Sequence, residues 1–134
     1  MAYVSTFHVE VRSYELDVYD HVNNAVYINW LEHGRSKFLQ DKGFNYVNII
    51  DQWGVRFMTV RTEIDYRIAL KLGDQADVAT SVERFGNTSV TFRQTIARAT
   101  DRETAADARV VIVFTDKDSG RPVPVPDHFK GLCT

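Results

Sequence analysis

The chain has 134 residues, of which 44% are hydrophobic and 12% aromatic, and its net charge is −2. This length and apolar content predict one compact domain over residues 1–134, since two domains would be crowded. The nearly neutral charge argues against general nucleic-acid binding, which needs a concentrated basic face.

Cysteine content and hydropathy exclude several further classes. Cys133 is the only cysteine, so neither a disulfide framework nor a cysteine-based metal site is expected. The histidines show no metal-ligand spacing. The first twelve residues alternate apolar and polar, unlike a signal peptide, and no stretch is long enough to span a membrane. We therefore expect a cytoplasmic protein without a metal, a membrane segment or a nucleic-acid partner.

The order of elements begins with a strand and a long helix. Alternation over Tyr3 to Arg12 predicts a strand with one buried face. After a polar, turn-rich stretch, apolar positions recur from Asn24 at three- and four-residue spacing, which predicts a helix with Asn23 or Asn24 as its N-cap and Gly43 as its C-cap. Gly34 lies in mid-helix, where we expect another element to pack closely.

The rest of the chain is strand-like. A connector over residues 44–54 precedes four alternating segments, 55–67, 76–82, 90–96 and 106–114, separated by turn residues. A stretch with three prolines follows the last strand. The predicted class is α+β, with about five mostly antiparallel strands curving around one helix. The edges and uncovered face of such a sheet predict a homo-oligomer, either a dimer or a tetramer.

Chemistry-bearing residues gather where the loop becomes the helix. Residues 17–24 read Asp-Val-Tyr-Asp-His-Val-Asn-Asn. The first N–H groups of a helix have no intrahelical partner and carry the positive end of its dipole. Such a junction therefore suits chemistry on a carbonyl that develops negative charge.

The order of elements and these motifs resemble the hotdog-fold thioesterases, specifically the 4-hydroxybenzoyl-CoA thioesterase-like acyl-CoA thioester hydrolases. The resemblance covers nearly the whole chain and is carried by Tyr-Glu-Leu-Asp at 14–17, His-Val-Asn-Asn at 21–24, the helix through Arg35, and Arg-Pro-Val-Pro-Val-Pro at 121–126. It implies the hotdog fold and hydrolysis of acyl-CoA or aroyl-CoA thioesters. CoA would then be part of the substrate, and no separate cofactor is expected.

The resemblance also implies roles for individual residues. Asp17 would act as nucleophile or general base, and the main-chain N–H of Asn24 would polarise the thioester carbonyl. His21 would orient Asp17 or water, donate a proton to the leaving thiolate, or hydrogen-bond the loop backbone. Further substrate-binding candidates divide into acyl-pocket walls, which are Tyr19, Tyr27 and Trp30 with Leu31, Phe57 and Met58, and polar contacts to CoA, which are Arg61, Arg84 and Ser89.

Several alternatives stay open at this point. Asp17 could merely cap a turn, and Glu32 is a reserve carboxylate that otherwise forms an i, i+3 ion pair with Arg35. The motif also resembles plant acyl-acyl carrier protein thioesterases, although those have a carboxylate in the segment matching 66–69, where this chain has Ala69. An acyl-thioester hydratase and a non-catalytic acyl-thioester-binding domain are the remaining alternatives.

Overall fold

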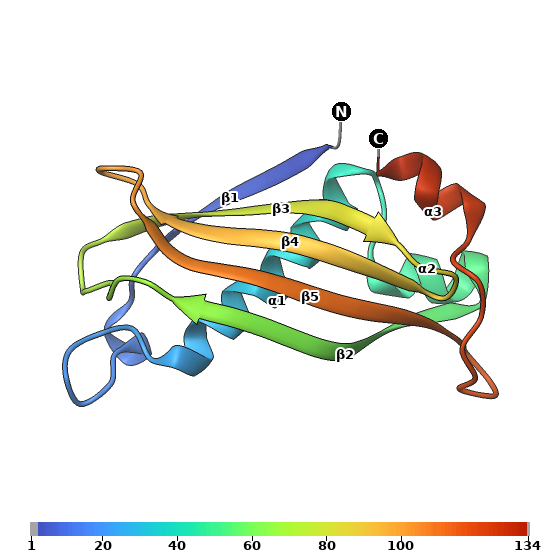
Figure 1. Cartoon of the computed structure of the whole chain (residues 1–134), viewed down its shortest axis with the longest axis horizontal. Helices are drawn as coiled ribbons and strands as arrows, with labels where there is room; N and C mark the ends of the chain where they lie inside the picture. The colour runs from blue at the N-terminus through green and yellow to red at the C-terminus, as the bar shows by residue number, and fades with distance from the viewer. Residues whose placement is uncertain (1–2, 134) are drawn as a thin grey trace.

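A computed structural model describes residues 3–133. The chain forms one five-stranded antiparallel sheet with a long helix across one face (Figure 1). The elements in chain order are β1 (Val4–Glu10), a 3-10 turn η1 (Ser13–Glu15), α1 (Asn24–Asp41), α2 (Tyr46–Trp53), β2 (Val55–Tyr66), β3 (Gln75–Phe85), β4 (Ser89–Arg98), β5 (Thr104–Asp116) and α3 (Asp127–Leu132). This confirms the predicted order of one strand, one long helix and four strands.

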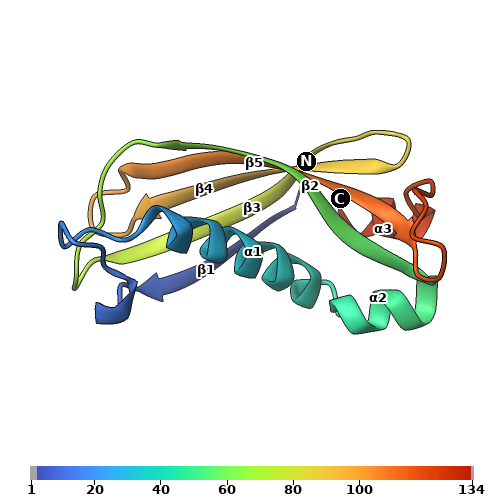
Figure 2. The same ribbon diagram turned by 90° about the horizontal axis from the view of Figure 1, so that it is seen from below.

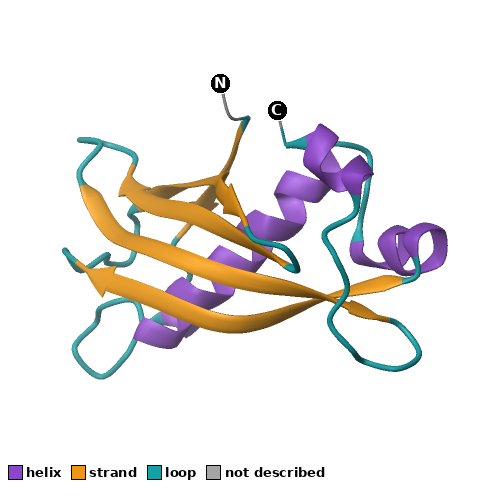
Figure 3. Cartoon of the chain, turned by 45° about the vertical axis from the view of Figure 1, so that its right-hand side comes forward, coloured by secondary structure: helices purple, strands orange, loops and turns teal. Residues whose placement is uncertain are grey.

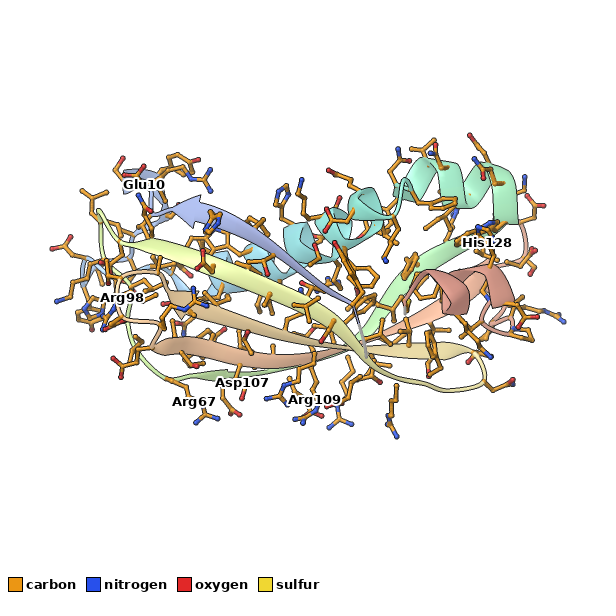
Figure 4. The ribbon with its side chains drawn as sticks, turned by 90° about the horizontal axis from the view of Figure 1, so that it is seen from above. Glu10, Arg67, Arg98, Asp107, Arg109 and His128 are labelled. Atoms are coloured by element: carbon orange, nitrogen blue, oxygen red, sulfur yellow. The ribbon has the colours of Figure 1, made fainter. Side chains whose placement is uncertain are left out.

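The sheet has the spatial order β1-β3-β4-β5-β2, and every neighbouring pair is antiparallel. Strands β1 and β2 are therefore its two edges. Their alternate side chains point toward α1 and away from it, as the two-residue period of a strand requires. Asp107 and Arg109 project from the face opposite to α1 (Figure 4), where Arg109 donates to Glu83 at 3.0 Å.

Helix α1 begins where the sequence predicts, but its C-cap is Lys42, one residue before the predicted Gly43. The Asn23 side-chain oxygen accepts a hydrogen bond from the Ala25 N–H at 2.9 Å, which caps the first turn. At the other end Gly43 has a φ of +83°, a left-handed conformation that glycine adopts without steric cost. The helix lies mainly against β1 and β3, so the part of the same face formed by β2 is left beside it rather than beneath it (Figure 2).

The predicted close packing at Gly34 is confirmed. A Cβ added at Gly34 would lie 2.8 Å from the Thr80 hydroxyl and 3.0 Å from the Gln94 side-chain nitrogen. That nitrogen donates to the Leu31 carbonyl and to the Thr80 hydroxyl, each at 2.8 Å. A buried polar network therefore joins the middle of α1 to β3 and β4.

Two helices were missed by the sequence interpretation. Residues 44–54 are not a plain connector, because α2 occupies most of them, capped by the Asn45 side chain and ended by Gly54 with a φ of +66°. The segment after the prolines forms α3, which brings Phe129 against Phe57 and Phe114. Both short helices lie at the same end of the sheet (Figure 3).

Candidate active site

The loop before α1 is closed on itself by main-chain hydrogen bonds. The Asp17 N–H donates to the His21 carbonyl at 2.7 Å, and the Asp20 N–H donates to the Asp17 carbonyl at 3.1 Å. Asp20 adopts a φ of +60°, which Asp tolerates better than most residues. The loop is therefore a tight turn that fixes the position of Asp17.

One oxygen of the Asp17 side chain holds this turn together. Its Oδ1 accepts hydrogen bonds from the N–H groups of Tyr19 at 2.8 Å and His21 at 3.2 Å. Within residues 3–133 no group donates to Oδ2, and the half-buried side chain lines a cavity of about 220 Å³, hereafter the Asp17 cavity. Turn capping and chemistry are thus compatible, because each can use a different oxygen.

The start of α1 forms the second wall of the Asp17 cavity. Asn24 is the first residue of the helix and lines the cavity. Asn23 supplies its side chain to the Ala25 N–H, whereas the Asn24 N–H meets no acceptor among the described residues. An unpaired N–H at the positive end of a helix is suited to hold an oxyanion.

The third wall comes from the end of β2 and the segment after it, whose cavity-lining residues are Tyr66, Arg67, Ile68 and Ala69. The Tyr66 hydroxyl donates to the Asn24 carbonyl at 3.2 Å. The Tyr27 hydroxyl donates to the Ile68 carbonyl at 3.4 Å and accepts from the Leu70 N–H at 3.2 Å. Burial raises the pKa of both tyrosines, so both stay protonated at neutral pH. Neither Tyr66 nor Arg67 is among the site residues predicted from the sequence.

His21 serves the loop through its main chain. Its N–H donates to Asp17, and it forms an isolated bridge with Lys71. The half-buried imidazole also lines the Asp17 cavity, but no hydrogen bond of its side chain is found among residues 3–133. The main chain of His21, and not its imidazole, therefore contacts the Asp17 carboxylate in the described chain.

Other candidate substrate-binding residues lie outside the wall of the Asp17 cavity. Tyr19 is 76% exposed, and Trp30 is buried, with its indole N–H donating to Glu15 at 3.1 Å. Arg61 pairs with Glu63. Neither Arg84 nor Ser89 lines the cavity. Of the side chains proposed to bind substrate, only Tyr27 lines the Asp17 cavity within residues 3–133.

A second cavity, of about 230 Å³, lies between α1, α2, β2 and β5. Phe57 and Met58, predicted as acyl-pocket walls, line it together with Arg35 and Glu32. The predicted ion pair between these last two residues is wrong: Arg35 has no carboxylate within 4.0 Å in the described chain and donates instead to Gln94 at 3.0 Å. We call this space the Arg35 cavity.

The described residues form neither a metal site nor a membrane-spanning helix. No group of three or more His, Cys, Asp or Glu side chains within residues 3–133 is arranged to hold a metal ion. No helix in the same range combines the length and apolarity needed to cross a bilayer.

The family follows from comparison with known proteins. The model of the thioesterase-like superfamily matches residues 11–132. The chain belongs to this superfamily. The match includes both the Asp17 loop and the whole sheet beyond β1.

Individual relatives of the superfamily agree with this membership. The chloroplast acyl-acyl carrier protein thioesterase ATL2 of Arabidopsis thaliana is 31% identical over 91% of this chain and 64% of its own length. This chain thus spans slightly less than two thirds of that relative. The long-chain acyl-CoA thioesterase FadM of Escherichia coli K12 is 30% identical over 81% of this chain and 80% of its own length.

Structural comparison confirms the predicted hotdog fold. The crystal structure of Slr0204, a 1,4-dihydroxy-2-naphthoyl-CoA thioesterase from Synechocystis, superposes with a TM-score of 0.88. The match covers 96% of this chain and 94% of the other at 16% identity, so it bears on the fold alone.

Proposed function

We propose that the chain, acting as a single domain over residues 1–134, hydrolyses acyl-CoA or aroyl-CoA thioesters to a free acid and CoA. The observation that carries this proposal is the Asp17 cavity. It places a carboxylate with one uncommitted oxygen and a helix-start N–H with no acceptor in the described chain on the walls of one small space. Membership of the thioesterase-like superfamily supports the same chemistry.

The geometry suggests how the bond is broken. The thioester carbonyl accepts from the Asn24 N–H, which stabilises the oxyanion when a nucleophile adds to the carbonyl carbon. In one route Asp17 Oδ2 takes a proton from water, whose oxygen adds to that carbon. In the other Oδ2 adds directly, forming an anhydride that water then hydrolyses. Either way the C–S bond breaks, the thiolate takes up a proton, and the acid is released.

The first experiment compares isosteric variants in the same loop. Asp17→Asn retains an oxygen to cap the turn but loses the carboxylate, so thiol release from a panel of acyl-CoAs is expected to fall by at least about 100-fold. Asp20→Asn is the matched control, because Asn also tolerates a positive φ and the Asp20 side chain does not line the cavity. Equal turnover by wild type and Asp17→Asn would refute the role of Asp17.

A single-turnover reaction in water enriched in heavy oxygen tests for direct attack by Asp17. Direct attack leaves the heavy isotope in the Asp17 carboxylate after the anhydride is hydrolysed at that carbon. General-base catalysis leaves it in the product acid alone.

In a second candidate function, the acyl group is carried by acyl carrier protein and not by CoA. The similarity to an acyl-acyl carrier protein thioesterase favours testing the same acyl group on CoA and on acyl carrier protein. We propose CoA as the carrier, so kcat/KM is expected to be higher with CoA. Binding of both thioesters without thiol release would instead indicate a non-catalytic binding domain, and hydration of an enoyl-CoA would indicate a hydratase.

We further propose that the protein is a homo-oligomer that pairs through β2. This strand is an edge of the sheet and carries Met58 and Val60, which are 48% and 59% exposed, while Ile28 on the adjacent helix is 40% exposed. Open strand edges flanked by apolar side chains are suited to pairing with a second copy. Light scattering after gel filtration should give a dimer or tetramer mass, and a monomer mass would refute this proposal.

A further inference from the structure

The Arg35 cavity is separate from the Asp17 cavity within the protomer. Both lie beside α1, yet they share no lining residue. Asn24 and Arg35 are eleven residues apart on the helix, which corresponds to about 16 Å along its axis. The Arg35 cavity is also more apolar, with Ile50, Phe57 and Met58 among its walls.

Arg35 is an unusual residue to find in such a wall. Its side chain belongs to the buried set, with 7% of the residue exposed. Its one hydrogen bond in the described chain goes to the neutral side chain of Gln94, although a guanidinium offers five donors and keeps its charge in proteins. Burial lowers the pKa of Arg35. Glu32 attracts Arg35 across the cavity without forming an ion pair with it, so the guanidinium keeps donors that an anion in the cavity could meet.

A second donor faces the same space. Tyr46 on α2 lines the cavity, and its hydroxyl has no hydrogen-bond partner among residues 3–133. Burial raises the pKa of Tyr46, so at neutral pH the hydroxyl is protonated and can donate. A guanidinium and a phenol against apolar walls match a carboxylate joined to a hydrocarbon body.

We propose that the Arg35 cavity binds a carboxylate carried on an aliphatic body, with Arg35 as its counter-ion and the Tyr46 hydroxyl as a second donor. Two sources have this chemistry. One is a free fatty acid. The other is the far end of an acyl group that carries a terminal carboxylate, and this source alone rests on the proposed thioesterase function.

Glu32 gives the proposal a distinctive test. Its exposed carboxylate lines the same cavity, so it repels a bound anion, and it forms no ion pair with Arg35 in the described chain. Glu32→Gln removes this repulsion. An octanoate affinity that Glu32→Gln leaves unchanged would place the bound carboxylate away from this cavity.

The experiment is calorimetric titration of the wild-type protein with octanoate and with 1-octanol, which differ only in the charged head group. Octanoate is expected to bind about tenfold more tightly, because its carboxylate meets Arg35. Arg35→Met should abolish that difference and Glu32→Gln should increase it. Arg56→Met is the matched control, since it removes an exposed guanidinium from the same cavity and should change octanoate affinity less than threefold.

Two results would overturn the proposal: equal affinity of the wild type for octanoate and 1-octanol, or unchanged octanoate binding in Arg35→Met. Because Arg35 also bonds Gln94, its variant could fail to fold. Tyr46→Phe then provides an independent test, since it should weaken octanoate about threefold while 1-octanol binding stays constant. Asp17→Asn should bind octanoate with the affinity of the wild type. A lower affinity would place octanoate in the Asp17 cavity and refute the proposal.

The two sources are distinguished by turnover. With a series of acyl-CoAs matched in length, a terminal carboxylate should raise kcat/KM over a terminal methyl if the substrate itself occupies the cavity, and Arg35→Met should remove the preference. No preference, together with tight octanoate binding, identifies the free acid as the ligand. The titrations need no catalysis, so they remain decisive even if no thioester is hydrolysed.

Discussion

The Asp17 cavity and the Arg35 cavity are built in opposite ways. The first takes its polarity from a short stretch of chain: a carboxylate held by main-chain N–H groups and a helix end seven residues later. The second is assembled from α1, α2, β2 and β5, and the charge proposed to bind its ligand is the buried side chain of Arg35. In the Asp17 cavity, a local turn and a helix start are arranged to stabilise the negative charge that develops on a reacting carbonyl. In the Arg35 cavity, residues far apart in sequence are arranged around a ligand that already carries a charge.

The difference also lies in how each site tolerates change. In the Asp17 cavity the important donor is a main-chain group, so the identity of the Asn24 side chain should matter little. In the Arg35 cavity the side chains themselves supply both the charge and the walls. The predictions below test this distinction.

The largest effect is expected from Asn24→Pro. Proline is favoured at the first position of a helix, and Asn23 already has the extended conformation that precedes proline, with φ −60° and ψ 138°. The substitution therefore removes the proposed oxyanion donor while α1 is retained. We expect kcat for thioester hydrolysis to fall by about 100- to 1000-fold, with an unchanged far-ultraviolet circular dichroism spectrum.

Asn24→Ala is the matched control, because it keeps the N–H and loses only a side chain. Its kcat should stay within about threefold of wild type. If the alanine variant were as inactive as the proline variant, the side chain and not the main chain would be the functional group.

A smaller effect, on stability, is expected from Gly34→Ala, because the added methyl group would contact the hydrogen-bonded network that also holds Arg35. The new Cβ would crowd the Thr80 hydroxyl and the Gln94 amide. Overpacking costs about 1–3 kcal/mol, against a gain of about 1 kcal/mol in helix propensity. We expect a lower free energy of unfolding in urea. Asn29→Ala on the exposed side of α1 is the control, and a more stable Gly34→Ala would contradict the close packing.

The smallest effect concerns Glu15, which supports the base of the Asp17 loop by accepting the Asn23 N–H on its carbonyl at 2.9 Å. Burial alone would raise the pKa of its side chain, but hydrogen bonds from Arg12 and Trp30 outweigh burial and lower it. A lowered pKa contributes stability above the unfolded value of about 4.3 that is lost as the pH falls through the folded value.

Glu15→Gln should therefore reduce the free energy of unfolding by about 1 kcal/mol at pH 7, and the difference from wild type should shrink by pH 3. Urea unfolding at the two pH values measures this. Glu10→Gln, at an exposed position on β1, is the control. A difference that grew at low pH would contradict the lowered pKa.

Much of the fold was predictable because its signals are local. The long period over α1, the alternation in the later strands and the cap at Asn23 each depend on neighbours in sequence. Helix α2 was not predicted because its eight residues form little more than two turns, too few for a clear helical period, although Asn45 and Gly54 mark its ends. Helix α3 is shorter still.

The site residues also divide into those with a local sequence signal and those without one. Asp17, Asn24 and Tyr27 could be singled out because motif and helix start coincide, and the structure brings them to one cavity. Tyr66 reaches the site because the end of β2 lies beside the start of α1, where its hydroxyl donates to the Asn24 carbonyl. Arg35 bonds to Gln94, which is 59 residues away in the sequence. Neither follows from spacing along the chain. The absence of a cofactor and the cellular location stay predictions.

The position of β2 has a consequence for how the chain folds during synthesis. β2 follows α2 directly, but its partner in the sheet is β5, which begins 38 residues after β2 ends, at Thr104. In a nascent chain β2 therefore has no hydrogen-bonded partner strand until β5 has been synthesised, and such non-local pairing is slow. Charged residues along β2 and just after it, among them Arg56, Arg61, Glu63 and Arg67, are the kind that keep an unpaired strand from aggregating before its native partner forms. Because Tyr66 ends this strand, the wall that meets the start of α1 is completed only once β5 has formed.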